Sequence, residues 1–144
     1  MTRWMSPLLL LLGACAGKPI AASFASAATA PQPDVFACLR KQIGAEGWSQ
    51  ESYDTGEYRV SARKYDLDAR RPDVQFRRLI HRVTFDVDPG GESEITTIRV
   101  DAATYAEYTT QRGPTEVQEK TAPTALEAAR RMAQACAAGA PGTG

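Results

Sequence analysis

Hydrophobic and polar residues alternate along the middle of the chain, which predicts antiparallel β-strands with one buried face. In the clearest segment, residues 78–87, the apolar side is formed by Leu79, His81, Val83, Phe85 and Val87. Four strands are expected in all, over residues 48–53, 58–63, 78–87 and 94–102. Residues 88–91 contain a proline and two glycines, so we expect a turn between the last two strands.

Helical spacing replaces this alternation on both sides of the strands. One helix is expected over residues 33–43, where the apolar positions recur at intervals of three or four: Phe36, Leu39 and Ile43. A second helix is expected from about residue 123, because Thr124 and Glu127 have the spacing of a capping box. Its inward side is expected to comprise Leu126, Ala129, Met132, Ala133 and Cys136, with Gly139 as the stop signal.

This order of elements predicts a single α+β domain over residues 33–139. We expect an antiparallel four-stranded meander flanked by an N-terminal and a C-terminal helix (α-ββββ-α), with both helices packed on one face of the sheet. Residues 15–32 are rich in alanine, serine, threonine and proline and show no periodicity, which predicts a disordered tether. Residues 140–144 are expected to form a disordered tail.

A short apolar run near the N-terminus ends at a cysteine. Arg3 precedes the run Pro7–Leu12, and Leu12, Gly13 and Ala14 stand directly before Cys15. This arrangement resembles the lipobox of bacterial lipoprotein signal peptides. The resemblance implies that residues 1–14 are removed, that the thiol of Cys15 carries diacylglycerol and that its freed amine is acylated. The lipid would then hold the protein on a membrane, at the outer membrane or the cell surface.

Two other interpretations of this N-terminal segment compete with the lipobox. A transmembrane anchor needs about 20 apolar residues, whereas Met5–Ala16 is shorter and Lys18 follows it. An ordinary secretory signal would be cut after the triplet Ala25–Ser26–Ala27, which would leave a secreted or soluble periplasmic protein. The lipoprotein signal and the secretory signal both place the domain outside the cytoplasm.

The two remaining cysteines are expected to form a disulfide, because the compartment is oxidising. In an up-and-down meander, an even number of strands leaves the flanking helices antiparallel. The start of the first helix then lies beside the end of the last, which brings Cys38 near Cys136. With three strands, the sulfurs would be about a helix length apart, far more than a disulfide allows. The alternative is two unrelated buried thiols.

The chain has no net charge, yet its charges are segregated along the sequence. Residues 59–82 contain eight Lys or Arg and three Asp, whereas residues 86–119 contain eight Asp or Glu and two Arg. One interpretation is a basic outer sheet face that binds an anionic partner such as an envelope protein or polymer, formed by Arg59, Arg63, Arg78, Arg82 and Arg99. The other is that basic and acidic strands are neighbours and pair across the sheet.

No strong catalytic or metal-binding pattern is present in the sequence. His81 is the only histidine, and it alternates with apolar residues, which favours a packed side chain over a general base. Asp66, Asp68 and Asp73 lack the glycine and the terminal glutamate of a calcium loop. We therefore expect no metal, no cofactor and no enzymatic activity. Nucleic acid is disfavoured as a partner by the charge balance and the compartment.

Two classes of function are compatible with these features. The first is a non-enzymatic envelope lipoprotein whose small domain binds a partner or supports an assembly. The second is a carrier of a small apolar ligand, with a pocket between the helices and the sheet. Its lining would come from Phe36, Trp48, Val83, Phe85 and Met132.

Overall fold

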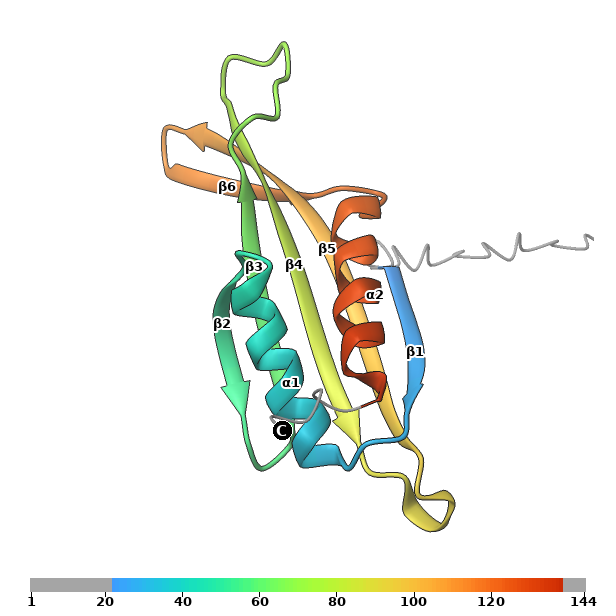
Figure 1. The fold of residues 1–144 in the computed structure, drawn as a ribbon. Helices are drawn as coiled ribbons and strands as arrows, with labels where there is room; N and C mark the ends of the chain where they lie inside the picture. The colour runs from blue at the N-terminus through green and yellow to red at the C-terminus, as the bar shows by residue number, and fades with distance from the viewer. Residues whose placement is uncertain (1–21, 139–144) are drawn as a thin grey trace, which may run out of the picture.

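The computed structural model describes residues 22–138 as one antiparallel sheet with two helices packed on one of its faces (Figure 1). The strands are β1 (Ala22–Ala28), β2 (Ser49–Asp54), β3 (Arg59–Asp66), β4 (Phe76–Asp88), β5 (Thr96–Thr110) and β6 (Gly113–Gln118). The helices are α1 (Gln32–Ala45) and α2 (Pro123–Ala137), and a short 3₁₀ helix spans Gly91–Ser93. The strand order is β1-β5-β4-β3-β2, and β6 also pairs with β5.

The expected four-stranded meander is wrong, because the sheet has six strands. The four expected strands correspond to β2, β3, β4 and β5. The two additional strands both pair with β5, with β1 along its first half and β6 along its second half. Residues 22–28, assigned from the sequence to a disordered tether, therefore belong to the folded domain. Residues 113–118, expected to be a loop, form the second strand of a hairpin.

Strand β1 was hidden in the sequence by its small side chains. Phe24, Ser26 and Ala28 face the helices while Ser23, Ala25 and Ala27 are exposed, so the strand does alternate in burial. Because alanine and serine occur at both the buried and the exposed positions, the sequence shows little contrast in hydrophobicity between the two sides. Tertiary contacts hold the segment in place: the amide of Thr29 donates to the carbonyl of Ala137, at 2.8 Å.

The disulfide between Cys38 and Cys136 is confirmed, with the two Cα atoms 5.6 Å apart. Helices α1 and α2 run antiparallel, as Figure 1 shows, and their contact carries the bridge. Five strands separate the helices in sequence, but β6 leads back toward α2 without a further reversal of the chain (Figure 1). The four strands β2 to β5 therefore determine the relative direction of the helices, as expected from the sequence.

The hydrophobic core lies between the helices and the sheet. Its largest fully buried side chains include Phe85, Leu39, Ile43, Ile98 and Met132. Helix α2 packs closely because most of its buried positions are alanines. This helix begins after Ala122, and no side chain caps it, so the capping box expected from Thr124 and Glu127 is not formed.

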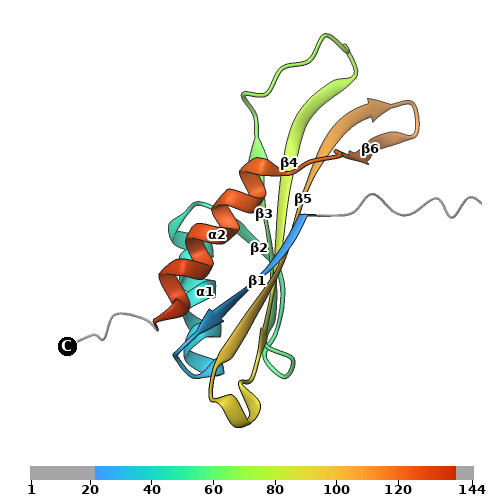
Figure 2. The same cartoon turned by 90° about the vertical axis from the view of Figure 1, so that its right-hand side faces the viewer.

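The sheet is longer than the helices that cover it. At one end, which we call the distal end, β3, β4, β5 and β6 continue past the start of α2, and the loop of residues 67–75 extends farthest (Figure 1). Figure 2 shows that this part of the sheet leans away from the helices. At the opposite, proximal end, β4 and β5 are joined by the turn that contains Gly91–Ser93. The bend leaves a recess beside the start of α2.

Candidate functional site

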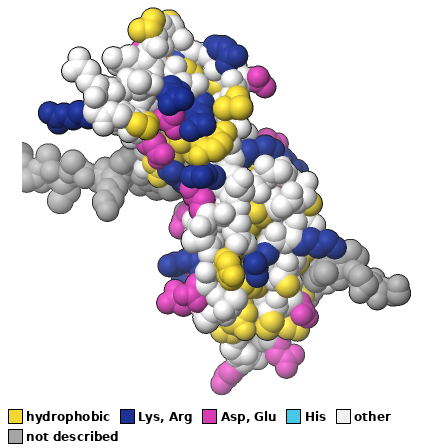
Figure 3. All heavy atoms as spheres, turned by 90° about the vertical axis from the view of Figure 1, so that its left-hand side faces the viewer, with side chains coloured by type: hydrophobic (Ala, Val, Ile, Leu, Met, Phe, Trp, Pro, Cys, Tyr) yellow, Lys and Arg dark blue, Asp and Glu magenta, His cyan; other side chains and the backbone are white. Residues whose placement is uncertain are grey.

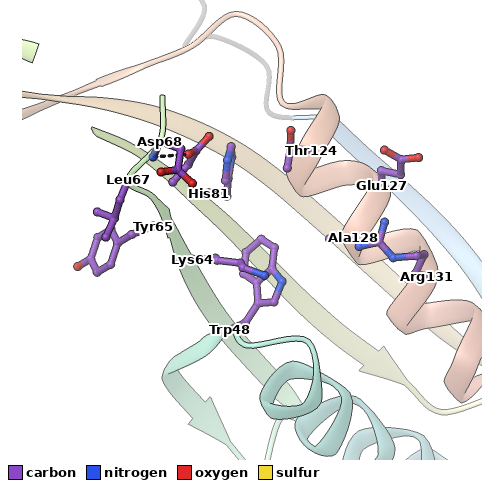
Figure 4. Close-up of a pocket in the computed structure, with 11 residues that line it drawn as sticks. Trp48, Lys64, Tyr65, Leu67, Asp68, His81, Thr124, Glu127, Ala128 and Arg131 are labelled. Carbon is purple, nitrogen blue, oxygen red and sulfur yellow. Dashed lines mark hydrogen bonds between the residues drawn. The ribbon is translucent and has the colours of Figure 1, made fainter. Parts of the chain in front are cut away.

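A hollow of about 450 Å³ opens on the helix side of the sheet, where the distal strands bend away from α2. We call it the His81 hollow. One side is formed by α2, and the other by the end of β3 and by β4 (Figure 4). Its lining comprises Trp48, Lys64, Tyr65, Asp66, Leu67, Asp68, His81, Thr124, Glu127, Ala128 and Arg131. The side chain of Tyr65 points away from α2 (Figure 4).

His81 lies on β4 between Lys64 of β3 and Thr104 of β5 in the strand register. Its side chain is buried, as the sequence alternation predicts, and only 5% of the residue is exposed. The ring Nδ1 is 2.9 Å from the hydroxyl oxygen of Thr104, whereas Nε2 has no hydrogen bond to any residue between 22 and 138. His81 is therefore a buried polar group with one nitrogen unused at the edge of a hollow.

Burial lowers the pKa of the His81 imidazole below its ordinary value of 6.5. The carboxylate of Asp66 opposes this shift, and the ammonium of Lys64 adds to it. The imidazole is therefore neutral at pH 7, with one nitrogen protonated and the other a hydrogen-bond acceptor.

The neutral state of His81 predicts a specific pH dependence of stability. The unfolded chain binds a proton at this residue more readily than the folded chain. The free energy of unfolding should therefore be highest above about pH 6.5 and fall as the pH drops below that value, by at most ~1.4 kcal/mol per pH unit. Urea unfolding measured between about pH 7.5 and pH 5.5 checks this.

His81→Gln is the matched variant for that measurement, because glutamine keeps an amide for Thr104 and does not titrate. The chain has no second histidine, so the difference between the two curves belongs to His81. The variant should lose the slope below pH 6.5. If it shows the same slope as the parent protein, the lowered pKa is wrong.

The basic side chains of the His81 hollow are already engaged. Lys64 Nζ donates to the backbone carbonyl of Glu46 at 2.9 Å, and Arg131 Nη2 donates to the carboxylate of Glu46 at 3.1 Å. Asp66 accepts the backbone amides of Asp68 and Ala69, both at 3.0 Å. These contacts hold the walls of the hollow in place, and Arg131 is paired with a carboxylate whereas Lys64 keeps its positive charge.

Other polar groups of the hollow have no partner within the described chain. The side chains of Asp68, Thr124 and Glu127 make no hydrogen bond or ion pair to another residue between 22 and 138. Asp68 stands at the end of β3, whereas Thr124 and Glu127 lie on the first turns of α2 (Figure 4). The hollow therefore offers free hydrogen-bond acceptors and negative charge on two opposite sides.

The pocket residues expected from the sequence are mostly elsewhere. Phe36, Val83, Phe85 and Met132 belong to the packed core, and only Trp48 borders the His81 hollow. Helices rich in alanine approach the sheet too closely to leave a cavity at its centre. The sequence did contain a partial signal for the His81 hollow, because alternation puts His81 on the buried side of its strand. The bend that opens the hollow carried no such signal.

The five arginines expected on the outer face of the sheet each have an acidic partner. The pairs are Arg59–Asp86, Arg63–Glu51, Arg78–Glu107, Arg82–Glu116 and Arg99–Asp88. Arg82 also reaches Glu51, at 3.4 Å. Basic and acidic strands are thus neighbours that pair across the sheet, which was the second interpretation of the charge pattern. A partner-binding role for these arginines stays a prediction, and the pairing reduces the positive charge that they offer.

An apolar row crosses the same outer face beneath the arginines. Tyr65, Ile80 and Tyr105 are neighbours on β3, β4 and β5, and Ile80 is only 1% exposed. The guanidinium of Arg78 lies 3.9 Å from the centre of the Tyr65 ring, and that of Arg82 lies 4.9 Å from the Tyr105 ring. Ile80, an apolar residue on the otherwise polar side of β4, is therefore covered by aromatic rings and arginines.

The remaining sequence-based expectations concern metals, the membrane and the lipid anchor, and they stay predictions. Among residues 22–138, no three His, Cys, Asp or Glu side chains are placed to share a metal ion. No helix in that range is long and apolar enough to cross a membrane. Cys15, the expected lipidation site, lies outside the described residues. No protein-family profile matches this sequence, and no curated protein is significantly similar to it.

Proposed function

We propose that this chain is a non-enzymatic binding domain of the cell envelope, held at a membrane surface by a lipid on Cys15. The resemblance of the segment before Cys15 to a lipobox supports the anchor. The Cys38–Cys136 disulfide is typical of proteins outside the cytoplasm.

Strand β1 also supports lipobox cleavage over an ordinary secretory signal. Cleavage after Ala27 would remove all of Ala22–Ala28 except its last residue. It would leave the first half of β5 without its neighbouring strand and take away Phe24, which packs against the core. An exposed strand edge of this kind invites aggregation. Cleavage before Cys15 leaves β1 whole.

The His81 hollow is the binding site in this proposal, and one observation carries it. A buried histidine with an unused nitrogen borders a hollow of about 450 Å³ that also presents the unpaired groups of Asp68, Thr124 and Glu127. Polar groups left without protein partners around a concave site are the pattern that ligand sites show. On the outer face the five arginines all have acidic partners. The two buried polar atoms without a hydrogen bond there, Arg63 Nε and Glu107 Oε1, belong to side chains that are already in ion pairs.

The unpaired groups indicate the chemistry of the ligand. Asp68 and Glu127 are carboxylates that accept hydrogen bonds and attract positive charge. Trp48 supplies an aromatic surface at the same hollow. A small amphipathic molecule with an amino group and an apolar body would satisfy both features. The proposed ligand site is therefore different from the central pocket expected from the sequence.

Fluorescence of Trp48 provides a direct test. Trp4 and Trp48 are the only tryptophans, and Trp4 precedes the proposed cleavage site, so the mature protein has a single emitter at the hollow. We expect 2-phenylethylamine to change this emission and phenylacetate, its match in size, to bind more weakly. Asp68→Asn and Glu127→Gln should each weaken amine binding about fivefold, since a partly exposed charge-assisted hydrogen bond contributes ~1 kcal/mol.

Glu57→Gln is the control, because Glu57 is an exposed carboxylate near the β2–β3 turn and does not line the hollow. It should bind the amine as the parent protein does. Equal or tighter binding of phenylacetate would refute the ligand chemistry. An absence of any response to the amine would refute the hollow as its binding site.

A further inference from the structure

The two ends of the sheet differ in charge and in exposed apolar surface. At the distal end, residues 67–77 together with Arg112 contain four arginines and two aspartates. At the proximal end, residues 88–95 contain three acids and no lysine or arginine. Figure 3 shows basic and hydrophobic side chains together on the upper lobe, and acidic side chains at the lower end. The domain therefore has a polarity along the sheet.

The distal tip, which we define as residues 67–77 and the β5–β6 turn at Gln111 and Arg112, exposes apolar side chains. Val74 is 98% exposed and Leu67 is 62% exposed. Two nearby arginines have no acidic partner within the described chain: Arg70 donates only to the carbonyls of Leu67 and Ala69, and Arg112 has no side-chain partner. Arg77 is also exposed, and its only acidic neighbour, Glu107, is 3.7 Å away.

The proposed anchor would be close to this tip. Strand β1 begins at Ala22, so Cys15 is seven positions away and can lie at most ~25 Å from it at ~3.3 to 3.6 Å per residue. Ala22 pairs with Ala102, and β5 continues for eight residues, about 27 Å, from there to the distal tip. A lipid on Cys15 therefore reaches about as far as the tip does.

Charge decides between the two ends, because the connection could also reach the proximal end: β5 begins at Thr96, only six residues or about 20 Å from Ala102. With the proximal end toward the bilayer, the acidic turn would face an anionic lipid surface, which repels it. With the distal end toward the bilayer, the arginines of the tip meet opposite charge.

We propose that the distal tip is a membrane-contacting surface, in which Val74 enters the headgroup region of an anionic bilayer and Arg70, Arg77 and Arg112 bind lipid phosphates. This inference rests on the lipid anchor of the proposed function. The tip shares Leu67 and Asp68 with the His81 hollow, but the residues proposed to contact lipid do not line the hollow. It also sets the opening of the hollow near the bilayer surface, where amphipathic molecules concentrate.

The test uses the lipidated full-length protein reconstituted into vesicles. A fluorophore is attached at Val74→Cys, without reductant so that the Cys38–Cys136 bridge is kept, and is quenched by brominated lipids. The matched control carries the same fluorophore at Glu92→Cys, at the proximal end. Quenching should be strong at Val74 and weak at Glu92 in phosphatidylcholine vesicles that contain phosphatidylglycerol.

Removing the negative charge of the lipid, or the positive charge of the tip, completes the experiment. In vesicles of phosphatidylcholine alone, quenching at Val74 should decrease. Replacing Arg70, Arg77 and Arg112 by glutamine should lower the population of membrane-bound tip about fivefold for each arginine when phosphatidylglycerol is present. Equal quenching at Val74 and Glu92, or none at Val74, would overturn the inference.

Intact-mass measurement of the same preparation separates this inference from the anchor. A mass that corresponds to a lipidated chain beginning at Cys15, together with an unquenched Val74 label, would refute the distal tip and leave the anchor standing. A mass without lipid would refute the anchor, and with it the basis of the inference.

Discussion

Replacing both Cys38 and Cys136 by alanine should lower the free energy of unfolding by about 4 kcal/mol, because the bridge closes a loop with a sequence separation of 98. For a domain of this size, that corresponds to a melting temperature lower by roughly 10 to 20 °C. The bridge joins α1 to the last turn of α2, so its loss removes the covalent link between the two helices. Thermal unfolding followed by circular dichroism under non-reducing conditions measures the effect.

Reductant supplies the control for this measurement. Reduction of the parent protein should lower its melting temperature to nearly that of the double alanine variant. The variant itself should not respond to reductant. A double variant that melts within about 2 °C of the oxidised parent would show that the bridge contributes little to stability.

Arg78→Gln should destabilise the domain by about 3 kcal/mol, although the residue lies on the outer face of the sheet. Its partner Glu107 has a side chain only 7% exposed, and both Nε and Nη2 of Arg78 donate to the same carboxylate oxygen, at 3.2 and 3.0 Å. Glu116 stands directly opposite Glu107 on β6. Without Arg78, a buried carboxylate would face another carboxylate, with only the more distant Arg77 to compensate. Chemical denaturation measures the loss.

Two companion variants make this prediction specific. Arg99→Gln removes an exposed pair with Asp88 and should cost ~0 to 1 kcal/mol. The double variant Arg78→Gln with Glu107→Gln should recover much of the lost stability, because it leaves no unpaired charge. If Arg78→Gln costs no more than Arg99→Gln, then the burial of Glu107 does not make this pair special.

The central strands and the disulfide were predictable because their signals are strong and mutually consistent. In residues 78–87, large apolar residues alternate with arginine, threonine and aspartate, which identifies β4. The cysteine pair then restricts the direction of the helices, and the four strands β2 to β5 satisfy that restriction. Local pattern and long-range constraint support the same arrangement here.

The missed elements lacked contrast in their own sequence. In β1, alanine and serine alternate, so a buried position and an exposed one look alike. In β6, Gly113 and Pro114 begin the segment and only Val117 is a large aliphatic residue. Both strands exist because β5 is long enough to pair with one along each half. Tertiary pairing supplies what local preference does not.

The His81 hollow was not predictable because it depends on shape. Alternation placed His81 on the correct side of the sheet, but the hollow also needs the bend of the distal strands and the point at which α2 begins. Glu127 was interpreted as half of a capping box, whereas in the structure it is an unpaired carboxylate of the hollow. Periodicity predicts which way a side chain faces, and it does not predict where packing stops.

The pairing of β1 with β5 has a consequence for the order in which the chain folds. Strand β1 pairs only with β5, which is synthesised after β2, β3 and β4. The disulfide of Cys38 forms later still, because Cys136 lies near the end of the chain. Such distant contacts slow folding, since the chain must close large loops before they form. In the proposed export, in which the chain crosses a membrane unfolded, this delay would be an advantage. The N-terminal part would not complete the fold before the C-terminal part had followed it to the other side.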